Sequence, residues 1–225
     1  MNVLVVAAHP DDETLGCGGY SAKLIRQGHA VNWLILGEGT TSRAADRTQV
    51  GSAELRSQSE DCLRAASIIG VGSVTQLELP DNRFDSLDLL DVAKLIESEI
   101  GAREPAIVIT HHRGDLNVDH RMTHEAVLTA TRPVPGSTVH TVLAFEVQSA
   151  TEWRFNRQDA FVPSVFVDIS DTIDLKMSAL EEYRSEMRQF PHPRSETAVR
   201  ALATLRGSTV GVPAAEAFEL VRAVR

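Results

Sequence analysis

The fold is decided by the stretch "VLVVAAHPDDE", which runs from Val3 to Glu13. Its first six residues are all apolar, and an unbroken apolar run of this kind is typical of a buried strand. His9, Asp11 and Asp12 follow almost at once. Ionisable side chains crowded at a strand end need either water or an opposite charge to stabilise them. The rest of the chain indicates which of the two is present.

Apolar runs alternate with segments of helical spacing along most of the chain. Further strands are expected at Ala30–Leu36, Val74–Leu79, Ala106–Thr110, Val139–Val147 and Ser164–Ile169. Helices are expected at Leu15–Gln27, Ala53–Ile69, Leu87–Ile100 and Asp119–Thr131. Near-continuous apolar strands separated by helices predict a mostly parallel sheet with helices on both faces. No repeat or linker interrupts the pattern, so residues 1–225 are expected to form a single α/β domain of the doubly wound, Rossmann-like class.

The C-terminal third continues the pattern with weaker signals. Asp171 is expected to cap a helix that runs to about Arg188. Ser195 is expected to cap another helix, which Gly207 would end. The segment from Ala215 onward has both strand and helix potential, and the sequence leaves the choice open.

The composition is that of an ordinary globular protein and excludes several classes. The chain has 225 residues, 43% hydrophobic and 24% charged, with a net charge of −9, which argues against a non-specific nucleic-acid binder. Its two cysteines, Cys17 and Cys62, cannot form a disulfide framework and are expected to pack as free thiols. Because neither a signal peptide nor a membrane span is predicted, the expected location is the cytoplasm.

A second group of ionisable residues follows the predicted strand Ala106–Thr110. Its members are His111, His112, Asp115, Asn117, Asp119 and His120, with His124 one helical turn further on. Doubly wound sheets bind ligands beyond the carboxyl ends of their strands, so this group and the one after Ala8 are expected to meet. A divalent metal explains the combination, because two imidazoles, a carboxylate and an open water position match a catalytic zinc site. His9 and Asp12 can converge across the turn, and His120 would close the site.

Three other interpretations stay open at this point. The acidic residues could simply cap helix N-termini, where they interact favourably with the helix dipole. Two histidines and a carboxylate also define the iron(II) site of non-haem oxygenases, although those enzymes usually have an all-β barrel and this chain does not. A metal-stabilised protein that binds a sugar or nucleotide without catalysis is the third interpretation, since fold does not fix function.

The two clusters carry a family resemblance. "HPDDE" after the first strand, with "DLNVDHR" at residues 115–121, resembles the LmbE-like, or PIG-L, family of metal-dependent N-acetylglucosamine de-N-acetylases. The resemblance extends to the helix from Ala53 to Gly70, to the turn Pro80-Asp81-Asn82, and to "PHPRS" at residues 191–195. The first motif is specific, whereas the others are weaker alone.

The resemblance implies a hydrolase that removes an acetyl group from an N-acetylated amino sugar or a conjugate of one. It implies a zinc ion, exchangeable with iron(II) or another divalent ion, held by His9, Asp12 and His120. Asp11 would be the general base that activates the metal-bound water, and Asp119 would support the ligands from behind. The partner would be a small molecule, and a homo-oligomer is compatible with the family.

The chain departs from the family pattern at one position. Many relatives have a histidine where this chain has Asn117, and an asparagine amide can donate a hydrogen bond but cannot act as an acid at neutral pH. Either Asn117 or His192, held between two prolines, is therefore expected to assist the oxyanion. Arg56 and Asp81 are the expected substrate ligands.

Other residues near the expected site are weaker candidates. Arg43 and Arg47 lie in the long loop after the second strand, and long loops inside α/β domains are commonly functional. They could contact an anionic aglycone. Trp153 could stack on a sugar ring.

Overall fold

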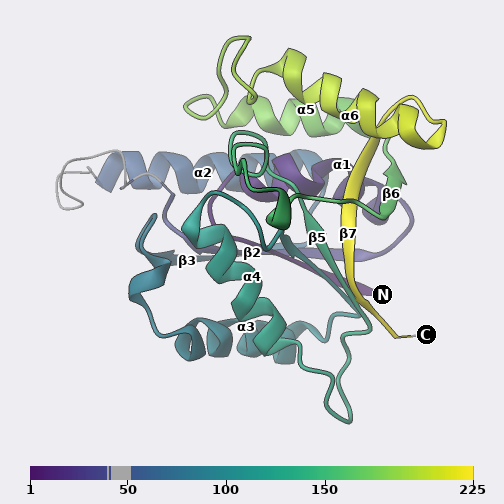
Figure 1. Cartoon of the computed structure of the whole chain (residues 1–225). Helices are drawn as coiled ribbons and strands as arrows, with labels where there is room; N and C mark the ends of the chain where they lie inside the picture. The colour runs from purple at the N-terminus through teal and green to yellow at the C-terminus, as the bar shows by residue number, and fades with distance from the viewer. Residues whose placement is uncertain (40, 42–51, 225) are drawn as a thin grey trace.

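The computed structural model describes residues 1–39, 41 and 52–224 and contains a seven-stranded sheet in the order β3-β2-β1-β4-β5-β7-β6 (Figure 1). The strands are β1 (Asn2–Ala7), β2 (Ala30–Gly37), β3 (Ser73–Leu79), β4 (Ile107–His111), β5 (Thr141–Phe145), β6 (Val165–Asp168) and β7 (Ala215–Ala223). The five strands from β3 to β5 pair in parallel, and β7 is antiparallel to both β5 and β6. The predicted α/β class with a mostly parallel sheet is confirmed.

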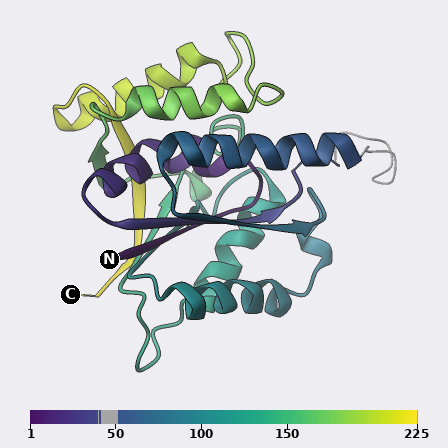
Figure 2. The ribbon, with the colours of Figure 1, turned by 180° about the vertical axis from the view of Figure 1, so that it is seen from behind.

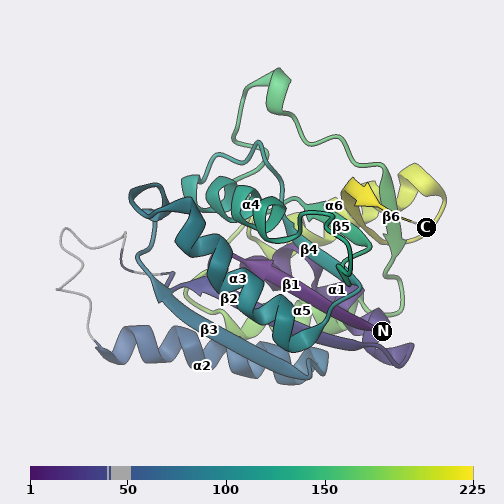
Figure 3. The ribbon, with the colours of Figure 1, turned by 90° about the horizontal axis from the view of Figure 1, so that it is seen from below.

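Helices cover both faces of the sheet. They are α1 (Asp12–Arg26), α2 (Ser52–Ile69), α3 (Leu89–Arg103), α4 (Val118–Ala130), α5 (Ile173–Glu182) and α6 (Glu196–Val210), with short 3₁₀ helices η3 (Phe84–Ser86) and η4 (Arg157–Asp159). The first two helices and α5 and α6 lie on one side of the sheet (Figures 1 and 2). On the other side α3 and α4 pack side by side (Figure 3).

The central strand β1 contributes to two cores because successive side chains of a strand point to opposite faces. Val3 and Val5 belong to the core under α1, α2 and α5, whereas Leu4 and Val6 belong to the core under α3 and α4. All four side chains are at most 1% exposed. Burial on both faces explains why this strand is apolar from Val3 to Ala7.

Helix α1 is broken at Cys17, whose φ of −149° is not helical. The break exposes backbone amides, and the carboxylate of Glu216 in β7 accepts hydrogen bonds from the N–H groups of Gly19 (2.9 Å) and Tyr20 (2.7 Å). Lys176 of α5 donates to the same carboxylate at 2.7 Å and to Leu15 O at 2.7 Å. A buried ion pair therefore holds the two halves of α1 together.

The C-terminal helices differ from their predicted bounds. The N-cap of α5 is Thr172 rather than Asp171, and the helix ends at Glu182 instead of continuing to Arg188. It ends there because Tyr183 leaves the helical conformation and its buried hydroxyl donates to Glu13 Oε1 at 2.6 Å.

The cap of α6 is Ser195, as predicted, and its side chain accepts a hydrogen bond from Ala198 N–H. The helix continues through Gly207, where the missing Cβ leaves room for Val212 O, and ends at Gly211 with a φ of 78°. The ambiguous segment after it is strand β7.

Other expectations concern single features. Cys17 and Cys62 are buried free thiols, as predicted. Within the described part of the chain, no helix combines the length and apolar character that crossing a membrane requires. Most of the long loop after β2, with Arg43 and Arg47, lies outside the described residues.

The contact between α1 and β5 tolerates only glycine at position 16. A Cβ at Gly16 would lie 2.3 Å from Phe145 Cδ2, so we expect Gly16→Ala to lower the free energy of unfolding by ~1–3 kcal/mol through overpacking. The matched control is Gly101→Ala in α3, where a Cβ meets nothing within 4 Å. This substitution should raise the free energy of unfolding by ~0.5–1 kcal/mol, because alanine loses less conformational freedom in a helix than glycine. Urea denaturation of both variants measures these changes. An unchanged stability for Gly16→Ala would show that α1 can move away from β5.

Candidate metal centre and active site

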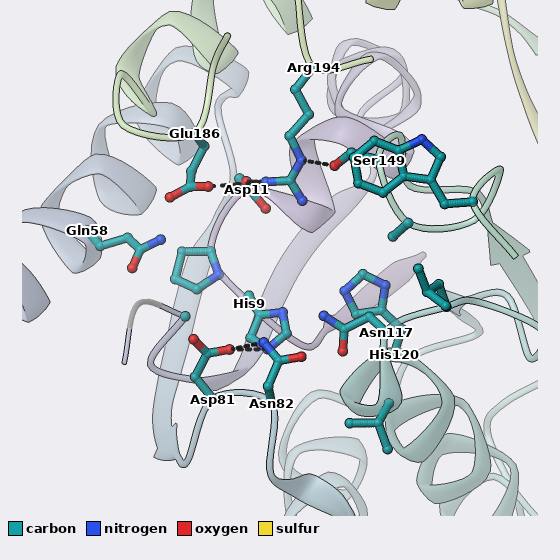
Figure 4. Close-up of a pocket in the computed structure, with 16 residues that line it drawn as sticks. His9, Asp11, Gln58, Asp81, Asn82, Asn117, His120, Ser149, Glu186 and Arg194 are labelled. Carbon is teal, nitrogen blue, oxygen red and sulfur yellow. Dashed lines mark hydrogen bonds and ion pairs between the residues drawn. The ribbon is translucent and has the colours of Figure 1, made fainter. Parts of the chain in front are cut away.

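A pocket of about 460 Å³ opens beyond the carboxyl ends of the parallel strands (Figure 4). Most of its lining comes from the segments after the five parallel strands: His9, Pro10 and Asp11 after β1, Gly39 after β2, Asp81 and Asn82 after β3, Leu116, Asn117, Val118 and His120 after β4, and Ser149, Ala150 and Trp153 after β5. The two clusters singled out in the sequence therefore meet in one cavity, whose size suits a small-molecule ligand.

His9 and His120 of the pocket lining and the buried Asp12 next to them place one ligand atom each within 4.8 Å of the others. Asp12 Oδ2 lies 3.3 Å from His9 Nδ1 and 3.2 Å from His120 Nε2. These are the three residues that the sequence suggested as metal ligands. Two imidazole nitrogens and one carboxylate are a donor set suited to zinc and to neighbouring divalent transition metals.

Each histidine of this cluster has a carboxylate on its other ring nitrogen. His9 Nε2 lies 2.9 Å from Asp119 Oδ2 and 3.2 Å from Asp81 Oδ1, and His120 Nδ1 lies 3.2 Å from Asp115 Oδ2. Carboxylates in this position orient a ligating imidazole and increase its basicity. Asp119, which the sequence suggested as a support for the ligands, thus contacts His9, and it also accepts hydrogen bonds from the backbone N–H groups of residues 82 and 84.

Unpartnered buried atoms test whether an ion fits this cluster. Asp12 Oδ1 and His120 Nε2 are buried and make no hydrogen bond of suitable geometry with the described residues, although His120 Nε2 lies 3.2 Å from Asp12 Oδ2. Such atoms are costly unless something satisfies them, and a divalent cation would satisfy both. Burial lowers the pKa of His120, but the carboxylates of Asp12 and Asp115 raise it to about 9, so the surroundings favour positive charge here.

His111 packs against this cluster and does not line the pocket. Its ring stacks on His120 with centroids 3.9 Å apart, and its Nε2 accepts a hydrogen bond from Ala8 N–H at 2.8 Å. Burial and the nearby His120 lower the pKa of His111 well below its usual range. It is therefore a neutral packing residue. His112 points away and pairs with Glu219 at 2.7 Å.

Asp11 sits beside the cluster without belonging to it, in an unusual conformation. Its φ is 108°, a value that non-glycine residues rarely adopt, and its backbone N–H donates to Glu13 Oε2 at 3.0 Å. Its carboxylate forms an ion pair with Arg194. Burial raises the pKa of Asp11 well above its usual range, while the charge of Arg194 opposes that rise.

Asn117 caps α4 and faces the pocket. Its side-chain oxygen accepts a hydrogen bond from Asp119 N–H at 2.8 Å, which leaves the amide NH₂ as the group that can serve a ligand. The residue lines the pocket beside His9 and His120. This placement is compatible with its predicted use as a donor.

The remaining predicted residues are divided between the pocket and its surroundings. Asp81 lines the pocket and is 4% exposed, and Trp153 lines it and is 39% exposed. Arg56 is exposed on α2, where Gln58 is the pocket-lining residue instead. His192 lies outside the lining, with its ring 5.8 Å from that of Trp153. The roles of Arg56 and His192 stay predictions.

Sequence reasoning missed two residues that line the pocket from the connection between α5 and α6, Glu186 and Arg194. Arg194 is next to Pro193 in the "PHPRS" motif, where the histidine attracted attention instead. No local pattern marks Glu186. Only the approach of this connection to the strand ends, which is a property of the folded chain, shows that both face the pocket.

The family can now be assigned. The model of the PIG-L family, described as GlcNAc-PI de-N-acetylase, matches residues 4–131, more than half of the chain. The chain belongs to the PIG-L family. The matched region contains both clusters of the pocket and ends before the segment that supplies Glu186 and Arg194.

Relatives of this PIG-L protein extend the similarity over most of its length. It is 26% identical over 189 residues to the uncharacterized deacetylase YaiS of Escherichia coli, covering 81% of this chain and 90% of that protein. It is 27% identical over 235 residues to diacetylchitobiose deacetylase of Thermococcus kodakarensis, covering 97% of this chain and 82% of that protein.

Solved structures share the fold. N,N'-diacetylchitobiose deacetylase from Pyrococcus horikoshii superimposes with a TM-score of 0.79 at 20% identity, covering 98% of this chain and 84% of the other. GalB, a 4-carboxy-2-hydroxymuconate hydratase from Pseudomonas putida, gives a TM-score of 0.76 at 24% identity, covering 100% and 97%. Since one is a deacetylase and the other a hydratase, the fold alone does not decide the reaction.

We expect the cluster to bind zinc and thereby to stabilise the protein. At a free Zn²⁺ concentration of 100 times the dissociation constant, the free energy of unfolding should rise by ~2.7 kcal/mol. His120→Ala should abolish both the rise and the binding measured by calorimetry. The matched control is His140→Ala, an exposed histidine outside the cluster, which should bind zinc like the wild type. Equal zinc binding by the His120 variant would contradict the assignment of the cluster.

Proposed function

We propose that this protein is a zinc-dependent hydrolase that removes the acetyl group from an N-acetylated amino sugar or a conjugate of one. The observation that carries the proposal is the buried carboxylate of Asp11, which lies beside a three-residue metal cluster and is not part of it. Membership of the PIG-L family and the similarity to deacetylases of N-acetylated sugars support the same reaction class.

The residues of the pocket divide the chemistry between them. Zinc held by His9, Asp12 and His120 would supply Lewis acidity, which acidifies water and polarises a carbonyl group. Asp11 would accept the proton of the attacking water and return it to the departing amine, because a carboxylate within hydrogen-bond reach can act in both directions. Water adds to the acetamide carbon, the carbon–nitrogen bond breaks, and acetate and a free amino sugar are released.

Asn117 would assist the same step by stabilising the oxygen of the acetamide as negative charge develops on it. Its NH₂ group is directed to the ligand because its oxygen is occupied by Asp119 N–H. A donor that is already oriented does not have to reorganise when negative charge develops on the oxygen, so it stabilises the transition state more effectively. This role replaces the histidine that many relatives have at the position.

The walls of the pocket suit a sugar. Asp81, Asn82 and Gln58 contribute polar groups to the lining, and Leu116 and Trp153 contribute partly exposed apolar surface. Hydroxyl groups of a sugar need such polar partners, and its less polar face packs well on an aromatic ring. Arg56 and His192 remain candidates for contacts beyond these walls.

Three alternatives lead to different experimental results. A binding protein without catalysis would not need an unligated buried acid beside its metal ions, and that acid is what favours an enzyme. An iron(II) oxygenase would be revealed by metal analysis of protein purified without added ions. Hydration of an unsaturated acid in place of amide hydrolysis would favour a reaction like that of GalB.

The first functional test measures acetate release from a panel of N-acetyl amino sugars and their conjugates. We expect release that a chelator abolishes and that added Zn²⁺ restores. Asp11→Asn should retain zinc but lose ~10²–10⁴-fold in turnover, the range typical of a lost general base. Near-normal turnover of this variant would show that Asp11 is not the base. Absence of acetate from the whole panel would contradict the proposed function.

The second functional test separates the two uses of Asn117. Asn117→Ser keeps an effective helix cap but cannot extend an amide donor into the pocket. We expect turnover to fall ~10²–10³-fold, as for loss of an oxyanion donor, while the urea midpoint and the zinc content stay near those of the wild type. Full turnover in Asn117→Ser would assign the stabilisation of the oxyanion to another group.

A further inference from the structure

Arg194 brings a buried positive charge to the acidic end of β1. Its Nη1 lies 2.5 Å from Asp11 Oδ2 and 3.2 Å from Glu186 Oε2 (Figure 4). The arginine side chain is only 16% exposed, and both carboxylates are 4% exposed. Ion pairs that are this far removed from water hold their geometry more firmly than surface pairs.

The guanidinium group is itself fixed from the other side. Its Nε donates to Ser149 Oγ at 2.7 Å and to Gln148 O at 3.3 Å. Together with Glu186, these contacts hold the planar group by three partners besides Asp11. A guanidinium fork is rigid, so fixing it also fixes the direction from which it meets a carboxylate.

The backbone of Asp11 is held independently of Arg194. Glu13 Oε2 accepts the Asp11 N–H at 3.0 Å, and Glu13 Oε1 accepts the hydroxyl of Tyr183 at 2.6 Å. These bonds maintain the positive φ of Asp11 but leave its side-chain torsions free. The contact with Arg194 is the one among the described residues that fixes the carboxylate.

We propose that Arg194 is a positioning residue that holds the carboxylate of Asp11 in the orientation needed for proton transfer. This inference rests on the proposed function, because it assigns Arg194 to the reaction through Asp11. Without it, the carboxylate would turn away from the neighbouring acids Asp12 and Glu186. Proton transfer requires the base within hydrogen-bond reach of the attacking water, and a displacement of about 1 Å can cost ~10²-fold in rate.

Two other roles for Arg194 give different results and are therefore testable. If Arg194 only stabilised the connection between α5 and α6, its replacement would lower turnover by the same factor whether or not Asp11 is present. As a direct substrate ligand, it would act mainly on KM. A positioning residue acts on kcat, and only while Asp11 can serve as the base.

The test is a double-mutant cycle between Arg194→Met and Asp11→Asn, assayed as acetate release by the zinc-loaded protein. We expect Arg194→Met to lower kcat by ~10²-fold with KM within about 3-fold of the wild type. In the Asp11→Asn background, assayed at high protein concentration, the same substitution should lower kcat by less than about 3-fold, because residues that act as a unit are non-additive.

Two measurements without turnover accompany the cycle. Zinc affinity of Arg194→Met, measured by chelator competition, should match that of the wild type. A crystal structure of this variant with zinc should show the Asp11 carboxylate displaced while His9, Asp12 and His120 keep their places. Arg188→Ala is the matched control, because Arg188 is an exposed arginine of the same connection whose hydrogen bonds go to backbone oxygens. It should leave kcat unchanged.

Each outcome decides the inference. Equal losses of kcat in both backgrounds, a rise in KM at constant kcat, or an undisplaced Asp11 carboxylate would overturn it. If Arg194→Met does not fold, Arg194→Lys keeps a positive charge without the planar fork, and the same non-additivity with Asp11→Asn is expected. Absence of acetate release by the wild type would instead overturn the proposed function, and this inference with it.

Discussion

Buried negative charge at the end of β1 is the constraint on which the rest of the structure depends. Asp11, Asp12 and Glu13 are consecutive, and each is at most 3% exposed. Removing a carboxylate from water costs several kcal/mol unless it is paired or hydrogen-bonded. The fold compensates for this cost at three consecutive residues, and the partners that stabilise the carboxylate differ for each residue.

The three carboxylates have separate sets of partners. Asp12 faces the imidazoles of the β1 and β4 loops, Asp11 faces the guanidinium of Arg194, and the donors to Glu13 in the described part of the chain are neutral groups, including the Tyr183 hydroxyl. Three carboxylates that are adjacent in the sequence thus acquire different properties from their surroundings. One is suited to hold a cation, one to exchange a proton, and one to keep the backbone in place.

Much of the fold could be predicted because its signals are local. The central strands are mostly apolar, and the helices between them end next to residues such as Gly28 and Gly70, which have positive φ. The proposed metal ligands were visible for the same reason, since His9 and Asp12 are close in sequence and His120 follows another strand end of the same sheet.

The parts that could not be predicted depend on distant contacts. The apolar spacing of the segment that forms β7 fits a helix as well as a strand. Its pairing with β5 and β6 makes it a strand. The early end of α5 depends on Tyr183 reaching Glu13, 170 residues away in the sequence. Arg194 likewise meets Asp11 across 183 residues, and no local pattern marks such a pair.

The bond between Glu216 and the broken helix α1 has a consequence for biosynthesis. Gly19 and Glu216 are separated by 197 residues, and contacts of such long range are among the slowest to form during folding. A ribosome releases the first residues of this chain long before Glu216 has been made. The backbone N–H groups of Gly19 and Tyr20 can therefore bond this carboxylate only after β7 has been synthesised and inserted beside β5.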